Sequence, residues 1–131
     1  MKLLINGKDA LKTWGAFLQE GSENNLFLPA NNKPIVTNKS RLEHGKRVVI
    51  DEVYIDERDV ILTFCIQANS RVEFKQKYKS FVEELRKGLT RLEYDSEVYK
   101  FLLKDFMELD FFNRLGTLSV RFNEPNPNDR D

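Results

Sequence analysis

The sequence has little of what catalytic or disulfide-bonded proteins usually carry. It contains one cysteine and one histidine in 131 residues. The single cysteine, Cys65, excludes an internal disulfide, and it lies in the apolar run VILTFCI, where we expect it to pack as a small hydrophobic side chain. The single histidine, His44, leaves little material for the nucleophile, base and orienting group that an active site combines.

Excess charge and long hydrophobic runs are also missing. Lysine and arginine together number 21, as do aspartate and glutamate, so the formal net charge is zero and the basic excess of a nucleic-acid-binding protein is lacking. No apolar run approaches the roughly 20 residues that span a bilayer, and the opening MKLLINGKDA turns polar too early for a secretory signal. We expect a protein that is made in the cytoplasm and does not enter a membrane.

Motifs with known chemistry are not found. The sequence has no glycine-rich phosphate loop, no Cys/His cluster with metal spacing and no G-x-S-x-G. Carboxylate pairs such as Asp56 with Glu57, or Asp105 with Glu108, are left as candidates for acid–base chemistry, but acid-rich turns beside strands are usually solvated. We therefore expect no catalysis, no cofactor and no metal.

The clearest regular element is a helix over residues 71–87. Its aromatic and aliphatic residues recur at spacings that form one apolar stripe. Ser70 and Glu73 have the spacing of a capping box, and Gly88 is suited to the left-handed conformation that closes a helix.

Short strands make up most of the remaining chain. DVILTFCIQ, residues 59–67, is too short and too rich in β-branched and aromatic residues for a helix, and it places Val60, Leu62, Phe64 and Ile66 on one face. Further strands are expected at KLLIN as an edge strand and at TWGAFLQEG, RVVIDEVYI, LTRLEY, EVYKFLL and TLSVRFN, while NNLFLPANNKP reads as a loop.

This pattern predicts a mainly β (α+β) fold. We expect an antiparallel β-sandwich or barrel of about seven strands with one long flanking helix, because most connections are too short for parallel crossovers. The length fits a single domain over residues 1–124, followed by a polar tail over residues 125–131.

The segment DFMELDFF, residues 105–112, combines aromatic and acidic side chains. Regular alternation would place Met107, Leu109 and Phe111 on one face, and Phe106, Glu108, Asp110 and Phe112 on the other. Burial in the core explains the first face. The second face mixes phenylalanine with acids, which fits a strand edge or a subunit contact, so Phe106 and Phe112 are candidate contact residues.

The stretch NKSRLEHGKRVVIDE, residues 38–52, gathers charge around the histidine. A charged turn with Gly45 at positive φ and an exposed histidine explains it most simply. Loops of this kind often carry function when a rigid sheet presents them, so we expect Arg41, His44, Lys46 and Arg47 in solvent or at a subunit contact.

The order of these segments resembles a known family. LLINGKDALKTWGAFLQEG at the start, SRLEHGKRVVIDEVYIDERDVILTFCIQ in the middle, the helix FKQKYKSFVEELRKG and LSVRFNEPNP at the end are together similar to short phage-tail proteins from prophages of Bacteroides-type bacteria. That group resembles the N-terminal domain of siphophage distal tail proteins and, more remotely, tail-tube proteins. The segment LLKDFMELDFF departs from the pattern, because a polar stretch is more usual there.

The resemblance implies a structural, non-enzymatic role in the virion tail. It implies a homo-oligomer, commonly a hexameric ring, that joins the tail tube to the hub at the tail tip while DNA passes through the lumen without specific binding. The chain ends at Asp131, before the C-terminal domain of many distal tail proteins, so no adhesin role is expected. Two alternatives remain open, a monomeric adaptor that binds a peptide at a sheet edge near DFMELDFF and a small hydrolase that uses His44 with a carboxylate.

Overall fold

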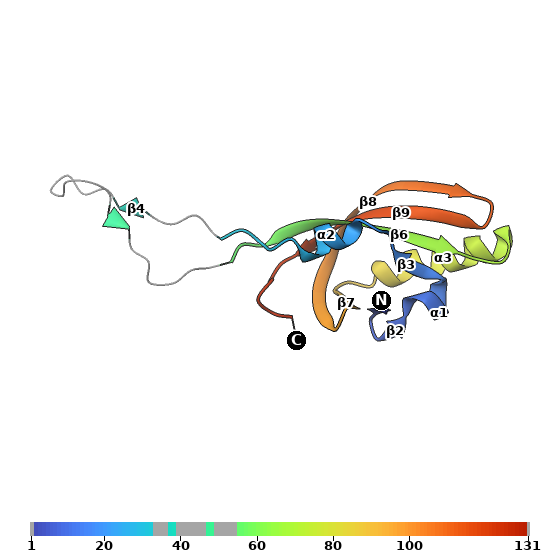
Figure 1. The fold of residues 1–131 in the computed structure, drawn as a ribbon, viewed down its shortest axis with the longest axis horizontal. Helices are drawn as coiled ribbons and strands as arrows, with labels where there is room; N and C mark the ends of the chain where they lie inside the picture. Colours follow the sequence, from blue (N-terminus) through green and yellow to red (C-terminus); the bar gives the residue numbers. More distant parts are fainter. Residues whose placement is uncertain (1, 33–36, 39–46, 49–54, 131) are drawn as a thin grey trace.

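One antiparallel sheet dominates the fold. The computed structural model describes residues 2–32, 37–38, 47–48 and 55–130. Seven strands pair in the order β2-β1-β7-β8-β9-β6-β3, and β4 and β5 form a separate ladder that Figure 1 draws away from this sheet. The elements are β1 (Leu3–Ile5), β2 (Lys8–Asp9), α1 (Ala10–Trp14), β3 (Ala16–Leu18), α2 (Ser22–Phe27), β4 (Thr37–Asn38), β5 (Arg47–Val48), β6 (Arg58–Gln67), α3 (Arg71–Leu85), β7 (Thr90–Tyr94), β8 (Glu97–Phe112) and β9 (Leu115–Glu124).

The predicted class, mainly β with antiparallel pairing, is confirmed. The sheet folds over because its longest strand, β8, changes neighbours along its length. Residues 97–101 pair with β7, whereas residues 102–112 pair with β9. In Figure 1, β8 curves down to β7 while β9 and β6 pass above α3. We call β3, β6, β9 and residues 102–112 of β8 the long-strand half of the sheet.

The long-strand half has an inner face that packs on α3 and an outer face that carries Cys65 and Thr117. The predicted alternation of β6 is confirmed, since Val60, Leu62, Phe64 and Ile66 are all buried. They pair across the sheet with inner residues of β9, namely Phe122, Val120, Leu118 and Gly116. Side chains of these strands therefore alternate between the buried inner face and the more exposed outer face with a period of two residues.

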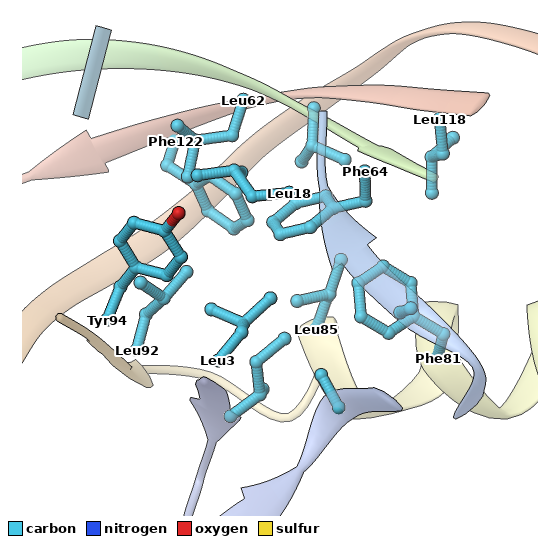
Figure 2. Close-up of a cluster of buried hydrophobic side chains, with 14 of the residues drawn as sticks. Leu3, Leu18, Leu62, Phe64, Phe81, Leu85, Leu92, Tyr94, Leu118 and Phe122 are labelled. Atoms are coloured by element: carbon cyan, nitrogen blue, oxygen red, sulfur yellow. The ribbon is translucent and has the colours of Figure 1, made fainter. Parts of the chain in front are cut away.

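The core lies between the two halves of the folded sheet. Figure 2 shows Leu62, Phe64, Leu118 and Phe122 from the long-strand half facing Leu3, Leu92 and Tyr94 from β1 and β7, with Phe81 and Leu85 of α3 completing the cluster. Phe64 meets Phe81 edge-on with ring centroids 5.1 Å apart. Among the described residues, this core joins both halves of the sheet to α3.

Helix α3 begins where the sequence predicts and ends two residues earlier. The Ser70 hydroxyl accepts a hydrogen bond from the Glu73 backbone N–H at 3.1 Å. The Glu73 carboxylate reaches the backbone N–H of Asn69 rather than that of Ser70, so the capping box is displaced by one residue. Arg86 caps the helix in the right-handed conformation, and Gly88 follows it with a positive φ of 122°, which favours glycine.

The amino-terminal third differs from the prediction. Only Ala16–Leu18 of TWGAFLQEG forms a strand, because Thr13 and Trp14 belong to α1, whose first turn is capped by the Asp9 carboxylate. Gly15 ends α1 at φ of 63°, and a Cβ atom there would lie 2.1 Å from the Gln67 carbonyl oxygen. The close approach of β3 to β6 thus requires glycine.

The segment NNLFLPANNKP is not wholly a loop, since its start lies in α2. The Ser22 hydroxyl ties this helix to the middle of β6 by accepting a hydrogen bond from the Thr63 N–H at 2.9 Å, next to the residues that pair with β3. KLLIN is not an edge strand either, because β2 pairs outside β1. Both differences come from pairings that no local pattern encodes.

Candidate interaction surface

The residues predicted for a subunit contact fall in two places. Arg41, His44 and Lys46 lie outside the described residues. Arg47 begins β5, where it pairs with Asn38 of β4. Phe106 and Phe112 both belong to β8, so this strand carries the predicted contact residues whose side chains the structure describes.

Beyond Phe101, β8 has a free side. Its residues 102–112 pair only with β9 within the described part of the chain, since β7 stops opposite Phe101. We call this stretch the open edge. Unpaired N–H and C=O groups along a strand of this length form a template for another strand. Strand β3, at the opposite border of the long-strand half, likewise has β6 as its single strand neighbour among the described residues.

The first part of the open edge, residues 102–108, has features that discourage non-specific pairing with another strand. Register shifts at Leu103/Asp105 and Phe106/Glu108 mark two β-bulges. Lys104 also forms an ion pair with Asp59 at 2.8 Å. The Lys104 ammonium, followed by the Asn123 amide, holds the pKa of Asp59 below its usual value. Bulges and charges are the features with which natural proteins discourage edge-to-edge pairing.

The second part, residues 109–112, has the opposite character. It pairs with β9 without a bulge and carries exposed apolar side chains, with exposed fractions of 39% for Leu109, 38% for Phe111 and 86% for Phe112. Leu115, across the turn, has an exposed fraction of 51%. In the described part of the chain Asp110 forms no ion pair. We call residues 109–112 the β8 tip; its exposed apolar surface is typical of a contact site.

The two bulges overturn the expected distribution of side chains on β8. Because each bulge adds one residue, Phe106 pairs with Val120 on the inner face together with Leu109 and Phe111. Phe106 packs against the core, and the Arg86 guanidinium lies 5.3 Å from its ring centroid. Glu108, Asp110 and Phe112 remain on the outer face. Phe106 and Phe112 therefore point to opposite sides of the sheet.

Aromatic stacking attaches the β8 tip to α3. Phe74 stacks on Phe111 with ring centroids 5.2 Å apart, and Tyr78 also stacks on Phe74, with ring centroids 6.1 Å apart. The Arg71 guanidinium lies 5.9 Å from the Phe111 ring centroid. A Cβ atom on Gly116 would come within 2.7 Å of both Phe74 and Phe111, so glycine makes room for the stack. The tip is thus held in place while one side of it stays exposed.

A shallow hollow lies on the outer face beside the tip. Its volume is about 330 Å³, and it is lined chiefly by Phe17, Cys65, Gln67, Asp110, Phe112 and Leu115. Partial burial raises the pKa of the Cys65 thiol, which keeps it protonated and unreactive at neutral pH. The hollow joins side chains from all four strands of the long-strand half, so it spans from the β3 border to the β8 tip.

A buried ionic cluster fixes the other end of the sheet. The Glu124 carboxylate is fully buried and forms ion pairs with Arg58 and Arg130. Arg58 also donates to the carbonyl oxygens of Leu26 and Leu28, and Arg130 lies 4.8 Å from the Tyr99 ring centroid. Sequence reasoning missed this cluster, because its members are far apart in the chain and none belongs to a motif.

Two of the candidate carboxylates, Asp56 and Asp105, have polar partners nearby. The Asp56 carboxylate accepts a hydrogen bond from the Glu57 backbone N–H, and Asp105 lies 3.8 Å from Arg121. The described residues contain no group of three or more His, Cys, Asp or Glu side chains that would hold a metal ion. In the same part of the chain, no helix has the length and apolar character needed to cross a membrane.

The sequence matches no protein family and no curated protein. Among solved structures, the chain is similar to the Dit protein of phage SPP1, described as a paradigm of the hub adsorption apparatus in phages that infect Gram-positive bacteria. The TM-score is 0.60 at 11% sequence identity, over 96% of this chain and 50% of that protein. The chain thus has a siphophage distal-tail-like fold and spans half the length of the SPP1 protein.

Proposed function

We propose that this protein is a structural component of a phage or prophage tail that assembles as a ring at the tail tip. The observation that carries the proposal is the likeness of its fold to SPP1 Dit over 96% of the chain. The segments that resemble tail proteins of Bacteroides-type prophages support the same role. The protein would act through its surfaces in the virion tail, without catalysis.

The open edge and the β8 tip support self-association. A closed ring needs heterologous contacts, in which one border of each subunit meets a different border of its neighbour. The long-strand half has two different borders of this kind, β8 and β3. Phe112 and the neighbouring apolar residues supply surface whose burial favours association.

The remaining partners follow from the proposed place at the tail tip. We propose contacts with tail-tube and hub proteins, and passage of DNA through the ring without specific binding. A formal net charge of zero is compatible with passage, because passage requires no grip on the phosphate backbone. Arg41, His44, Lys46 and Arg47 are proposed as further contact residues between subunits.

Light scattering after size-exclusion chromatography tests the ring. The expected result is a concentration-dependent oligomer, with ring-shaped particles in negative-stain electron microscopy. His44→Ala serves as a control for the hydrolase alternative, since a contact residue alters assembly and only a catalytic one abolishes an activity. A monomer at every concentration and no rings would contradict the proposal.

The open edge also favours a second candidate, a monomeric adaptor. Strand addition supplies affinity through main-chain hydrogen bonds, and the apolar tip would select the side chains of the bound peptide. The same chromatography separates the two functions. An adaptor elutes as a monomer. Its Phe112→Ser variant loses peptide binding and still elutes as a monomer.

A further inference from the structure

We infer that β3 of one subunit adds to the β8 tip of the next subunit and continues the long-strand half of the sheet from copy to copy. The inference rests on the proposed ring and specifies which residues meet. Leu18 and Ala16 of the partner subunit pair with Leu109 and Phe111. Phe17 of the partner subunit lies opposite Asp110.

The hydrogen bonds of β3 identify which of its backbone groups are free. The Gln67 N–H donates to the Gly15 carbonyl at 2.9 Å, and the Gln19 N–H donates to the Thr63 carbonyl at 2.8 Å. Gly15, Phe17 and Gln19 therefore direct their backbone groups to β6. In an antiparallel ladder successive residues point to alternate sides, so Ala16 and Leu18 direct theirs to the free side.

The same reasoning applies to the β8 tip. The Ala68 N–H donates to the Arg114 carbonyl at 2.9 Å, so Arg114 points to the β6 side and Leu115 points to β8. Leu115 pairs with Phe112 across a two-residue turn in which Asn113 has φ of 60°. Counting back along β8, Leu109 and Phe111 direct their backbone groups to the open edge. Each border thus presents two residues, separated by one, with free N–H and C=O groups.

The proposed pairing also matches the sheet faces on which the side chains of β3 and of the β8 tip lie. Ala16 and Leu18 pair with Ile66 and Phe64 and so belong to the inner face. Leu109 and Phe111 also belong to the inner face, opposite Leu118 and Gly116. An antiparallel pairing of the two borders therefore joins apolar inner side chains to apolar inner side chains. A register shift of one residue would break both matches.

The outer face gives a partner for the most exposed aromatic residue. With Asp110 opposite Phe17 of the partner subunit, Phe112 is the diagonal neighbour of that phenylalanine. Diagonal neighbours lie about 7–8 Å apart, within reach of aromatic side chains. The exposed Phe112 ring would then cover the border of the partner subunit's outer-face hollow, of which Phe17 is part.

Strand direction and strand length fit the same arrangement. The long-strand half has four strands that alternate in direction, so β3 and β8 run in opposite directions. Copies related by rotation about an axis along the strands therefore meet in antiparallel orientation. Strand β3 has three residues, and the bulge-free β8 tip has four, while the bulge after Phe106 would end a longer pairing.

Disulfide trapping between two different variants tests the pairing. Phe17→Cys and Asp110→Cys are made separately in a Cys65→Ser background, mixed and mildly oxidised. Opposite residues of a non-hydrogen-bonded pair have Cα atoms about 4.5 Å apart, within disulfide range. Within one copy β6 and β9 separate the two positions by three strand spacings, about 14 Å, which rules out an internal link.

The expected result is a linked dimer in the mixture and little in either variant alone. Asp105→Cys is the matched control, because it replaces another outer-face carboxylate of β8 beyond the bulge at Met107. We expect it to give at least about tenfold less linked dimer with Phe17→Cys. Rings without the Phe17–Asp110 link would overturn the pairing and leave the proposed function intact. A strict monomer without any link would overturn both.

Discussion

The two halves of β8 have the same strand conformation and opposite surroundings. In residues 97–101, Val98, Tyr99 and Phe101 are buried, and β7 covers the edge that is open farther along the strand. In residues 102–112, none of the side chains is buried and the edge is open. We call them the closed half and the open half. The comparison teaches that apolar composition alone does not place a residue of this strand in the core, because Phe101 faces the core between the two halves of the sheet whereas Phe112 lies on the outer face.

Removal of an aromatic side chain from the closed half should have the largest effect on the free energy of unfolding. Phe101 is fully buried and stacks on Phe122 with ring centroids 5.3 Å apart. We expect Phe101→Ala to lower the free energy of unfolding by about 3–5 kcal/mol, because it leaves a cavity. Phe112→Ala in the open half should change it by no more than about 0.5 kcal/mol. Urea unfolding followed by Trp14 fluorescence measures both, and equal losses would remove the distinction between the halves.

Neutralisation of the buried carboxylate should come next. Glu124→Gln leaves Arg58 without its charge partner, although Arg58 keeps its bonds to the Leu26 and Leu28 carbonyls. We expect a loss of about 3 kcal/mol. The control is Asp105→Asn, whose exposed ion pair with Arg121 is worth less than about 1 kcal/mol. Thermal unfolding monitored by circular dichroism compares them, and a tolerated Glu124→Gln would contradict an essential role for the cluster.

A smaller effect is expected where the open half attaches to α3. Gly116→Ala places a Cβ atom against Phe74 and Phe111, which must move apart. We expect a loss of about 1–3 kcal/mol from overpacking, together with faster amide hydrogen exchange at the β8 tip. Thr117→Ala, on the outer face, should change stability by less than about 0.5 kcal/mol. Unchanged exchange at the tip in Gly116→Ala would show that the stack does not hold the open half.

The smallest effect concerns alkaline pH at Tyr94 of β7, which pairs with Glu97 of the closed half. Burial, followed by the neighbouring Glu23 carboxylate, raises the pKa of Tyr94 to about 12 from an ordinary value of 10. A raised pKa favours the neutral form in the folded state, so the contribution is complete below pH 10 and is lost as the pH rises to about 12. Tyr94→Phe should lose less stability over this window. Parallel declines in variant and parent, measured by urea unfolding, would contradict the prediction.

Local patterns predicted the elements whose structure is determined locally. The alternation of β6 and the stripe and cap of α3 are each encoded within a few residues, and both were found. The antiparallel, mainly β class followed from the same strands. The exposed Phe112 was identified as a candidate contact residue because it shares its segment with acids, and its place in a contact stays a prediction.

Long-range pairings could not be predicted in this way. The face of Phe106 depends on two bulges that β9 imposes on β8. The Arg58–Glu124 ion pair joins residues 66 positions apart, and neither residue has a local pattern that suggests burial. The end of α1, Thr13 and Trp14, was taken for part of a strand because the five residues of this helix are too few to show a helical period. In the first two cases the missing information lies in the neighbouring strand β9.

The bulges also define where the hairpin can change length over evolutionary time. Lys104 and Met107 are the extra residues, so deletion of either one removes its own bulge, and Leu109 and Phe111 still face α3. Deletion of one residue within 109–112 would instead exchange the two faces of the tip unless a bulge were absorbed. Insertions and deletions in related chains should therefore collect at these two positions, and a designer could shorten β8 there without redesigning its surface.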